Sequence, residues 1–262
     1  MSKQSRIIPV AGVKNFRDMG GYQSTDGRII KWGHIFRSGH LAEMSNDNSI
    51  LNHNIQTVID FRSDAEKVRH PVQWTEGWEP QYRPVPIGGN AAAWVKELYD
   101  RLSKTNFPAK ELREQFIKAF EMIPIANKAG LKSFFDALLE DNGNNAVLFH
   151  CTAGKDRTGI AGALLMKALD VNDEQTMQDF LLTNDAVDLD ATSTTMAEWL
   201  SAKAGQKIAP SDVLPLVGVE ADFLIAAYGS IRTHFGSINA YLEDAMELVP
   251  ERRKKLQALY LR

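Results

Sequence analysis

A short apolar strand, a polar loop and a helix of small residues are expected in direct succession between residues 146 and 169. This unit constrains the fold more than any other segment. Residues 146–149 read AVLF, residues 150–158 are mostly polar, and residues 159–169 are rich in alanine and leucine. Because β-like segments precede this unit and helical segments surround it, we predict an α/β fold. No Pro/Ser-rich linker divides the chain, so we expect one domain over residues 1–262.

Other elements are predicted from the spacing of apolar residues. Residues 34–38 and 55–61 are predicted strands, and residues 81–86 contain two prolines, which suits only an edge strand. A helix is predicted over residues 173–182, with Asn172 or Asp173 as its cap. Apolar residues also repeat at helical spacing in five further runs. These runs cover residues 94–102, 112–123, 131–139, 221–231 and 238–246, and the third is followed by a loop over residues 141–145.

The segment between residues 204 and 218 lacks a helical pattern. Gly205, Pro210 and Pro215 interrupt it, which predicts a loop or a flap. A lid over the functional site could therefore lie within about residues 204–232. Phe223 and Tyr228 would belong to that lid, or else to the core, where aromatic residues at helical spacing are more often found.

The composition excludes several classes of protein. The 262 residues are 44% hydrophobic, too apolar for a disordered chain, and the formal net charge of −3 argues against a protein that coats nucleic acid. The single cysteine, Cys151, excludes an internal disulfide and a metal site of several cysteines, and we expect neither a metal nor an organic cofactor. The N-terminus lacks the apolar region of a secretory signal, and the longest apolar run, residues 159–166, is too short for stable membrane insertion. We expect a cytoplasmic protein, although export without a signal peptide stays open.

Residues 150–159 carry the strongest chemical signal. They read HCTAGKDRTG, in which five residues separate Cys151 from Arg157. A loop of this length between a strand and a helix can turn its backbone N–H groups toward one centre, and the helix dipole adds positive potential there. Gly154 permits the tight curvature, and Arg157 can bind two oxygens of one phosphate. The GxxxxGK[ST] phosphate loop does not fit, because Phe149 and Asp156 occupy two of its required positions.

Two interpretations of Cys151 compete. A lone cysteine in a buried strand is usually a core residue, but a core residue does not need a polar, glycine-containing loop behind it at the start of a helix. Helix N-termini and nearby cations stabilise a thiolate, which would attack the phosphorus atom of a phosphate bound in the loop. The hydroxyl of Thr158 would then help the sulfur to leave. Asp156 in the loop and Asp60 at the end of another strand are candidate general acids.

The loop resembles the CX5R signature of cysteine-based protein tyrosine phosphatases, and its ten residues resemble the HCxAGKDRTG loop of a bacterial family of these enzymes. Further stretches resemble the same family along nearly the whole chain. They are NFRDMGGY (15–22), FRSG (36–39), DFRSDAE (60–66), DFLLTN (179–184) and FGSINAYL (235–242).

This resemblance implies a tyrosine phosphatase-like fold, with a parallel-rich central sheet flanked by helices. It also implies that Cys151 is the nucleophile and Arg157 the phosphate clamp, with Thr152, Ala153, Gly154, Lys155 and Thr158 completing the substrate-binding loop. Asp156 is the favoured general acid, because members of the family lack the usual mobile loop that supplies an aspartate. Asp60 is second, and it would alternatively hold Arg62 or a loop amide.

The remaining expectations concern substrate and support. Lys155 would favour phosphoinositide head groups with several phosphates, or it would be solvated and add only to the general field. The substrates are then phosphotyrosine, with phosphoserine, phosphothreonine and phosphoinositides as further classes. Asn15, Arg17 and Asp18 are expected to support the loop or a turn, and His150 to orient the loop through hydrogen bonds.

Two other functions stay open from the sequence. A phosphate-binding module on the same fold would bind without turnover, and a redox protein would use Cys151, although no second cysteine is present for an internal disulfide. The identity of the physiological substrate and the oligomeric state do not follow from the sequence.

Overall fold

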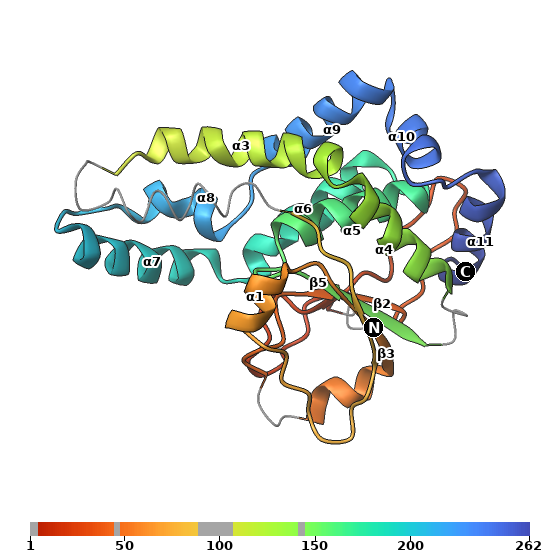
Figure 1. Cartoon of the computed structure of the whole chain (residues 1–262), viewed down its shortest axis with the longest axis horizontal. Coiled ribbons are helices and arrows are strands. Elements are labelled where there is room, and N and C mark those ends of the chain that lie inside the picture. The colour runs from red at the N-terminus through yellow and green to blue at the C-terminus, as the bar shows by residue number, and fades with distance from the viewer. Residues whose placement is uncertain (1–4, 45–47, 89–106, 141–144) are drawn as a thin grey trace.

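A mostly parallel sheet forms the centre of the protein (Figure 1). The computed structural model describes residues 5–44, 48–88, 107–140 and 145–262. In these residues the sheet has five strands in the order β1-β2-β5-β3-β4; β2, β5, β3 and β4 are parallel, and β1 is antiparallel to β2. The strands are β1 (Arg17–Asp18), β2 (Ile35–Ser38), β3 (Ile55–Asp60), β4 (Gln81–Pro84) and β5 (Ala146–His150). The predicted α/β fold with a parallel-rich sheet is confirmed, and β4 is an edge strand as expected from its proline.

Helices flank this sheet, and α3, α4, α6, α9 and α10 begin within three residues of the runs expected from the sequence, whereas α1, α7, α8 and α11 were not predicted. Asn172 caps α6, since its side chain accepts a hydrogen bond from the backbone N–H of Gln175. The predicted helix at 94–102 and residues 141–144 of the predicted loop lie outside the described residues. The α-helices are α1 (Asp64–Arg69), α3 (Ala109–Ala126), α4 (Lys128–Glu140), α5 (Asp156–Ala168), α6 (Asp173–Ala186), α7 (Leu189–Ala204), α8 (Leu214–Val217), α9 (Ala221–Phe235), α10 (Ile238–Asp244) and α11 (Pro250–Tyr260), and the 3-10 helices are η1 (Asn48–His53) and η2 (Pro210–Val213).

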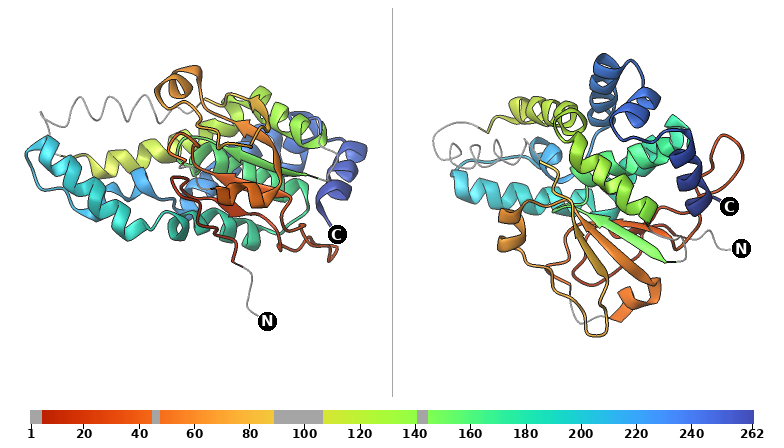
Figure 2. Two further views of the ribbon diagram at one scale, coloured as in Figure 1. Left: turned by 90° about the horizontal axis from the view of Figure 1, so that it is seen from below. Right: turned by 45° about the vertical axis from the view of Figure 1, so that its right-hand side comes forward.

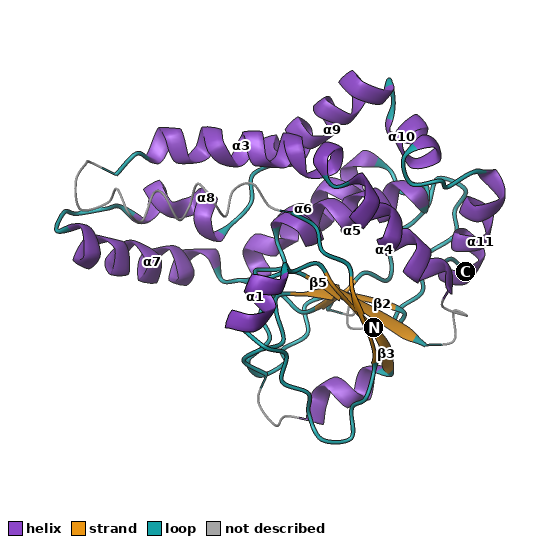
Figure 3. Ribbon diagram, viewed as in Figure 1, coloured by secondary structure: helices purple, strands orange, loops and turns teal. Residues whose placement is uncertain are grey.

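The two faces of the sheet pack against different layers (Figure 3). Because side chains alternate along a strand, Val147 and Phe149 of β5 join the large core under the helices, whereas Ala146 and Leu148 face the other side. That second side is covered by the N-terminal segment, by η1 and by Trp78. β5 is thus buried on both faces, as expected for the central strand of a parallel sheet.

The helices α3, α7 and α8 extend beyond one end of the sheet (Figure 2). The region predicted as an irregular flap contains η2 and α8, which pack against α7. Phe223 and Tyr228 of α9 are buried in the core, and Phe223 stacks on Phe116 and Phe120 of α3. This burial favours the core interpretation of Phe223 and Tyr228 over the lid, because α9 turns its aromatic residues toward α3 and α5.

No single helix in the described ranges is both long enough and apolar enough to cross a bilayer. Residues 210–217 and 221–235 reach the required length and composition only as a pair, with a bend of 43° between them.

Candidate active site

The carboxyl ends of three parallel strands meet at one edge of the sheet. Ser38 at the end of β2 and Asp60 at the end of β3 both pair with His150 at the end of β5. Cys151 follows His150 directly, so it lies where the chains leave the sheet. Ligands of open parallel sheets bind at this edge, beyond the carboxyl ends of the strands.

The loop after β5 is shorter than the sequence indicated. Helix α5 begins at Asp156 rather than at Gly159, so Asp156, Arg157 and Thr158 form its first turn. The apolar periodicity starts only at Gly159, but an aspartate at the first position suits the positive end of the helix. Lys155 is the N-cap residue, and its side chain caps no N–H group. The first N–H groups of α5 are therefore left without an intrahelical partner and are available to an anion.

The loop is held from outside through its carbonyl groups. The backbone N–H of His40 donates to the carbonyl of Thr152 (3.0 Å), and the carbonyl of Gly154 accepts from Asn15 Nδ2 (2.9 Å) and Arg37 Nη2 (3.0 Å). Among the hydrogen bonds found in the described part of the chain, none is donated by a backbone N–H of residues 152–155. This arrangement fixes the carbonyls on the outer side and leaves the N–H groups for a bound anion.

Gly154 is required by both its backbone and its surroundings. Its φ is +70°, a backbone conformation that residues with a Cβ atom disfavour. A Cβ atom at this position would also lie 2.4 Å from the carbonyl oxygen of Ser38. The close approach lets the loop pack directly on the end of β2. The predicted role of Gly154 in the curvature therefore fits the structure.

A buried polar cluster lies behind the loop. Asp179 of α6 binds Arg37 Nη1 (2.7 Å) and Arg17 Nε (3.5 Å), and Arg17 also donates to the side chain of Asn15. Burial and the charge of Arg37 lower the pKa of Arg17 to about 10, so Arg17 stays charged at neutral pH. Asn15 and Arg17 therefore lie where support of the loop was expected. Asp18 fits the other expectation, a polar group that supports a turn, because it accepts hydrogen bonds from the backbone N–H groups of Gly20 and Gly33 (2.7 Å each).

Cys151 lies at the base of the loop and is 1% exposed. Thr158 is fully buried, and its Oγ1 atom has no hydrogen-bond partner among the described residues. The side chain of Asp156 is 25% exposed, and its nearest cation is Lys155 Nζ, 3.7 Å from Oδ1. Oδ1 of Asp156 is buried and has no hydrogen-bond partner among the described residues.

Arg157 is positioned by a carboxylate that the sequence analysis did not single out. Glu66 of α1 binds both terminal nitrogens of Arg157, at 2.6 and 2.9 Å, and accepts a hydrogen bond from the hydroxyl of Thr152. Burial alone would raise the pKa of Glu66, but the hydrogen bonds from Arg157 outweigh it and hold that pKa below its ordinary value. Glu66 is also fixed from its own helix, because it forms a capping box with Ser63.

Asp60 is engaged by its own neighbours. It accepts hydrogen bonds from Arg62 Nη2 (2.8 Å) and from the hydroxyl of Tyr82 (2.7 Å), and it is fully buried. Although burial favours the neutral acid, the charge of His150 and the hydrogen bonds from Arg62 and Tyr82 keep the pKa of Asp60 below its ordinary value. The geometry favours the alternative interpretation of Asp60, a carboxylate that holds Arg62.

His150 joins Asp60 to the loop. Its Nδ1 atom lies 3.1 Å from the carbonyl oxygen of Cys151, and its Nε2 atom lies 3.7 Å from Asp60 Oδ2. Burial lowers the pKa of His150. The contact with the Cys151 backbone fits the expected orienting role.

Lys155 differs from both expectations for it. Its side chain is neither solvated nor open to the mouth of the site: the residue is 3% exposed, and Nζ donates to the carbonyls of Pro215 and Gly218. The sequence could not show this, because these partners are about 60 residues away.

Comparison with known proteins decides the family. A family model described as the tyrosine phosphatase family matches residues 8–262. This chain belongs to the tyrosine phosphatase family. A protein from Cupriavidus necator that is named as a tyrosine-protein phosphatase is 30% identical to this chain over 238 residues. The match covers 90% of this chain and 82% of that protein. The triple specificity protein phosphatase PtpB of Mycobacterium tuberculosis is 25% identical over 265 residues, 91% of this chain and 94% of PtpB. The resemblance seen in the sequence is confirmed.

Solved structures similar to this phosphatase family member were also found. Pseudomonas aeruginosa TpbA, in complex with phosphotyrosine, is 14% identical with a TM-score of 0.35, and the match covers 72% of this chain and 88% of TpbA. The core catalytic domain of the PP-IP phosphatase SIW14 from S. cerevisiae, in complex with citrate, is 12% identical with a TM-score of 0.32. That match covers 70% of this chain and 80% of the SIW14 domain.

A cavity of about 380 Å³ lies beside the loop of this phosphatase family member. Thr152 and Ala153 contribute to its lining, and the apolar residues Leu216 and Val217 of α8 form part of its wall. Its charged or titratable lining residues come from the N-terminal segment and from the end of α6 with its connection to α7. They are Lys14, His40, Glu43, Asp185 and Asp188.

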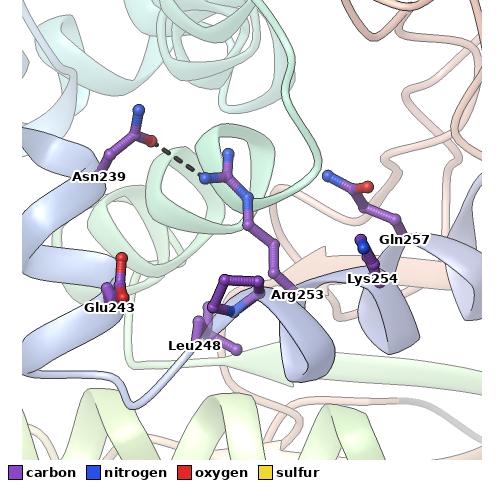
Figure 4. A pocket seen from close by; sticks show the side chains of 7 residues that line it. Asn239, Glu243, Leu248, Arg253, Lys254 and Gln257 are labelled. Carbon is purple, nitrogen blue, oxygen red and sulfur yellow. Dashed lines mark hydrogen bonds between the residues drawn. The ribbon is translucent and has the colours of Figure 1, made fainter.

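A second cavity, of about 370 Å³, lies between α10 and α11 (Figure 4). Arg253 lines it, donates to Asn239, and binds the carbonyls of Lys167 and Ala168. These carbonyls belong to the end of α5, about 18 Å along that helix from Asp156. Arg253 thus complements the negative end of α5, and this cavity is remote from Cys151.

No group of three or more histidine, cysteine, aspartate or glutamate residues that could hold a metal is present in the described part of the chain. Sequence reasoning missed Glu66, Arg37 and Asp179, although all three lie in the stretches that resemble the tyrosine phosphatase family. Their position in those stretches was the available signal, but their charge partners became known only from the fold.

Proposed function

We propose that this chain hydrolyses phosphate monoesters, with phosphotyrosine in proteins as the main substrate class, through a phosphocysteine at Cys151. One observation carries the proposal: Cys151 lies at the end of the central strand, beside the uncapped start of α5, with Arg157 held in place by Glu66. A thiolate there would face a bound phosphate from below, while the loop N–H groups and Arg157 bind the phosphate oxygens.

In the first step, the Cys151 sulfur attacks phosphorus, and the bond from phosphorus to the ester oxygen breaks. The electron pair of that bond leaves with the oxygen, which takes a proton from the carboxylic acid of Asp156. Arg157 compensates the charge that spreads over the phosphate oxygens in the transition state. Because Glu66 fixes the guanidinium by two hydrogen bonds, the clamp is oriented before substrate arrives.

In the second step, water attacks the phosphocysteine and the phosphorus–sulfur bond breaks. Asp156, now a carboxylate, accepts a proton from the water, so that inorganic phosphate and the thiolate are released. The buried hydroxyl of Thr158, which has no other partner among the described residues, is available to donate a hydrogen bond to the leaving sulfur.

The assignment of the acid is tested by two matched variants. We expect Asp156→Asn to lower kcat by about 100-fold for alkyl phosphates, whose leaving groups need a proton, and by less than about tenfold for p-nitrophenyl phosphate. Asp60→Asn should lower stability and affect both substrates equally, since Asp60 binds Arg62 and Tyr82. If Asp60→Asn shows the dependence on the leaving group, Asp60 is the acid and our choice is wrong.

The cavity beside the loop favours phosphoproteins over phosphoinositides. Glu43, Asp185 and Asp188 line it, against one lysine, Lys14. Burial lowers the pKa of His40, which therefore adds little positive charge at neutral pH. The additional phosphates of a phosphoinositide head group would face these carboxylates, whereas the ring and backbone of a phosphotyrosine peptide carry no such charge.

A turnover panel tests this substrate class. We expect kcat/KM for a phosphotyrosine peptide to exceed that for a soluble phosphoinositide carrying two or more phosphates by at least about tenfold. Release of inorganic phosphate is measured for both, with a phosphoserine peptide of the same sequence as a third substrate. A preference for the phosphoinositide would contradict the proposal. The cytoplasmic location and the single domain over residues 1–262 stay predictions from the sequence.

A further inference from the structure

Lys155 lies in the signature loop, but its ammonium group is directed away from the phosphate cradle. Nζ donates to the carbonyl oxygens of Pro215 (2.8 Å) and Gly218 (3.1 Å). It also lies 4.6 Å from the centre of the Phe116 ring of α3. Nζ also lies 3.7 Å from Oδ1 of Asp156. Two carbonyls, one aromatic face and this carboxylate thus replace water around the ammonium, which keeps the side chain in one position.

The segment that Lys155 binds is the connection between α8 and α9. Pro215 lies within α8, and Gly218 is its C-cap residue. The same connection is held from α6, because the Asn184 side chain binds the backbone N–H and the carbonyl of Val219 at 2.9 and 3.0 Å. A Cβ atom on Gly218 would lie 2.6 Å from Leu189, so the connection is closely packed.

This connection determines where one wall of the cavity lies. Leu216 and Val217, between the two carbonyls that Lys155 binds, line the 380 Å³ cavity together with Thr152 and Ala153. Lys155 follows Thr152 and Ala153 in the chain by two to three residues. One residue therefore links the phosphate-binding loop to the apolar part of the cavity wall.

We propose that Lys155 is a positioning residue that sets the Leu216–Val217 wall against the loop, and so governs the fit of the organic part of the phosphoester. The inference rests on the proposed function, because it takes the cavity as the place of the substrate beside its phosphate. It assigns Lys155 a partner other than the phosphate, so its charge does not select for substrates with several phosphates. Its loss is expected to affect large substrates more than small ones.

Kinetics with two substrates of different size test the inference. For Lys155→Met we expect the KM of a phosphotyrosine peptide to rise by about tenfold while its kcat changes by no more than about threefold, because an effect through the neighbouring Asp156 would lower kcat instead. For p-nitrophenyl phosphate, kcat/KM should fall by no more than about threefold. The inhibition constant of inorganic phosphate should also change by no more than about threefold. Leu216→Ala should give the same split without removing a charge, and Lys207→Met, which removes an exposed lysine, should give none.

A structural readout keeps the inference separate from the proposed function. Backbone hydrogen exchange over residues 213–220 should become faster in Lys155→Met and stay as in the wild type in Lys207→Met, whether or not the chain is an active phosphatase. Should Lys155→Met not fold, Lys155→Gln replaces it in both measurements. The inference is overturned if the inhibition constant of phosphate and the KM values of both substrates rise by the same factor, which would mean that Lys155 binds the phosphate. It is also overturned if exchange over residues 213–220 is unchanged.

Discussion

Replacement of Cys151 by serine is expected to lower kcat for p-nitrophenyl phosphate by about 10⁴- to 10⁶-fold, the range seen when a catalytic nucleophile is removed. A serine hydroxyl ionises far less readily than a cysteine thiol and is a poor nucleophile in this position. The loop N–H groups and Arg157 do not change, so the variant should still bind an oxyanion such as orthovanadate or phosphate. Turnover is measured by release of p-nitrophenol, and anion binding by calorimetry.

Three outcomes of this experiment are distinguishable. Loss of turnover with intact anion binding and an unchanged melting temperature supports the phosphocysteine mechanism. Turnover that survives in Cys151→Ser contradicts it. A wild-type chain that binds phosphotyrosine peptides but releases no phosphate would be the non-catalytic phosphate-binding module, the alternative that the sequence left open.

The second large effect is expected from Asp179, and it concerns stability. Asp179→Asn keeps the shape of the side chain but leaves the buried guanidinium groups of Arg17 and Arg37 without their counter-charge. Loss of one partner of a buried ion pair costs about 3–5 kcal/mol, so we expect the free energy of unfolding to fall by about that amount. Urea denaturation measures it. The matched control is Glu198→Gln on the exposed side of α7, which should stay within about 0.5 kcal/mol of the wild type.

The pH dependence of this difference follows from the sign of the pKa shift. Burial alone would raise the pKa of Asp179, but the charges of Arg17 and Arg37 outweigh it and place the pKa below its ordinary value. The stabilisation is therefore fully present above the unfolded-state pKa of about 4, and it is lost as the pH falls through the lowered folded-state pKa. The difference between wild type and Asp179→Asn should shrink in acid. A difference that is below about 1 kcal/mol at pH 7, or that grows in acid, would contradict the assigned role.

Much of the fold could be predicted because it follows from local patterns. Short runs of apolar and β-branched residues place β3 and β5, and the helical spacing places α3, α4, α9 and α10. The start of α5 could not be placed, because Asp156, Arg157 and Thr158 have no apolar period. The positions of Phe223 and Tyr228 in the core also required the packing of α9 on α3.

The same distinction applies within the candidate site. Cys151, Gly154 and Arg157 could be singled out because they lie within seven consecutive residues, and the chemistry of an anion-binding loop needs them together. Asp60 was an open choice between acid and support until Arg62 and Tyr82 were found on its carboxylate. Glu66 is 91 residues from Arg157, and no local pattern connects them.

By itself, the sequence determined the α/β class, the family resemblance and the composition of the anion-binding loop, since each depends on residues close together in the chain. Only the tertiary structure decided which charges stand behind that loop and where Lys155 points. Electrostatic and hydrogen-bond partners are set by distance in space, and those of Lys155, Arg157 and Gly154 come from segments 60 to 139 residues away.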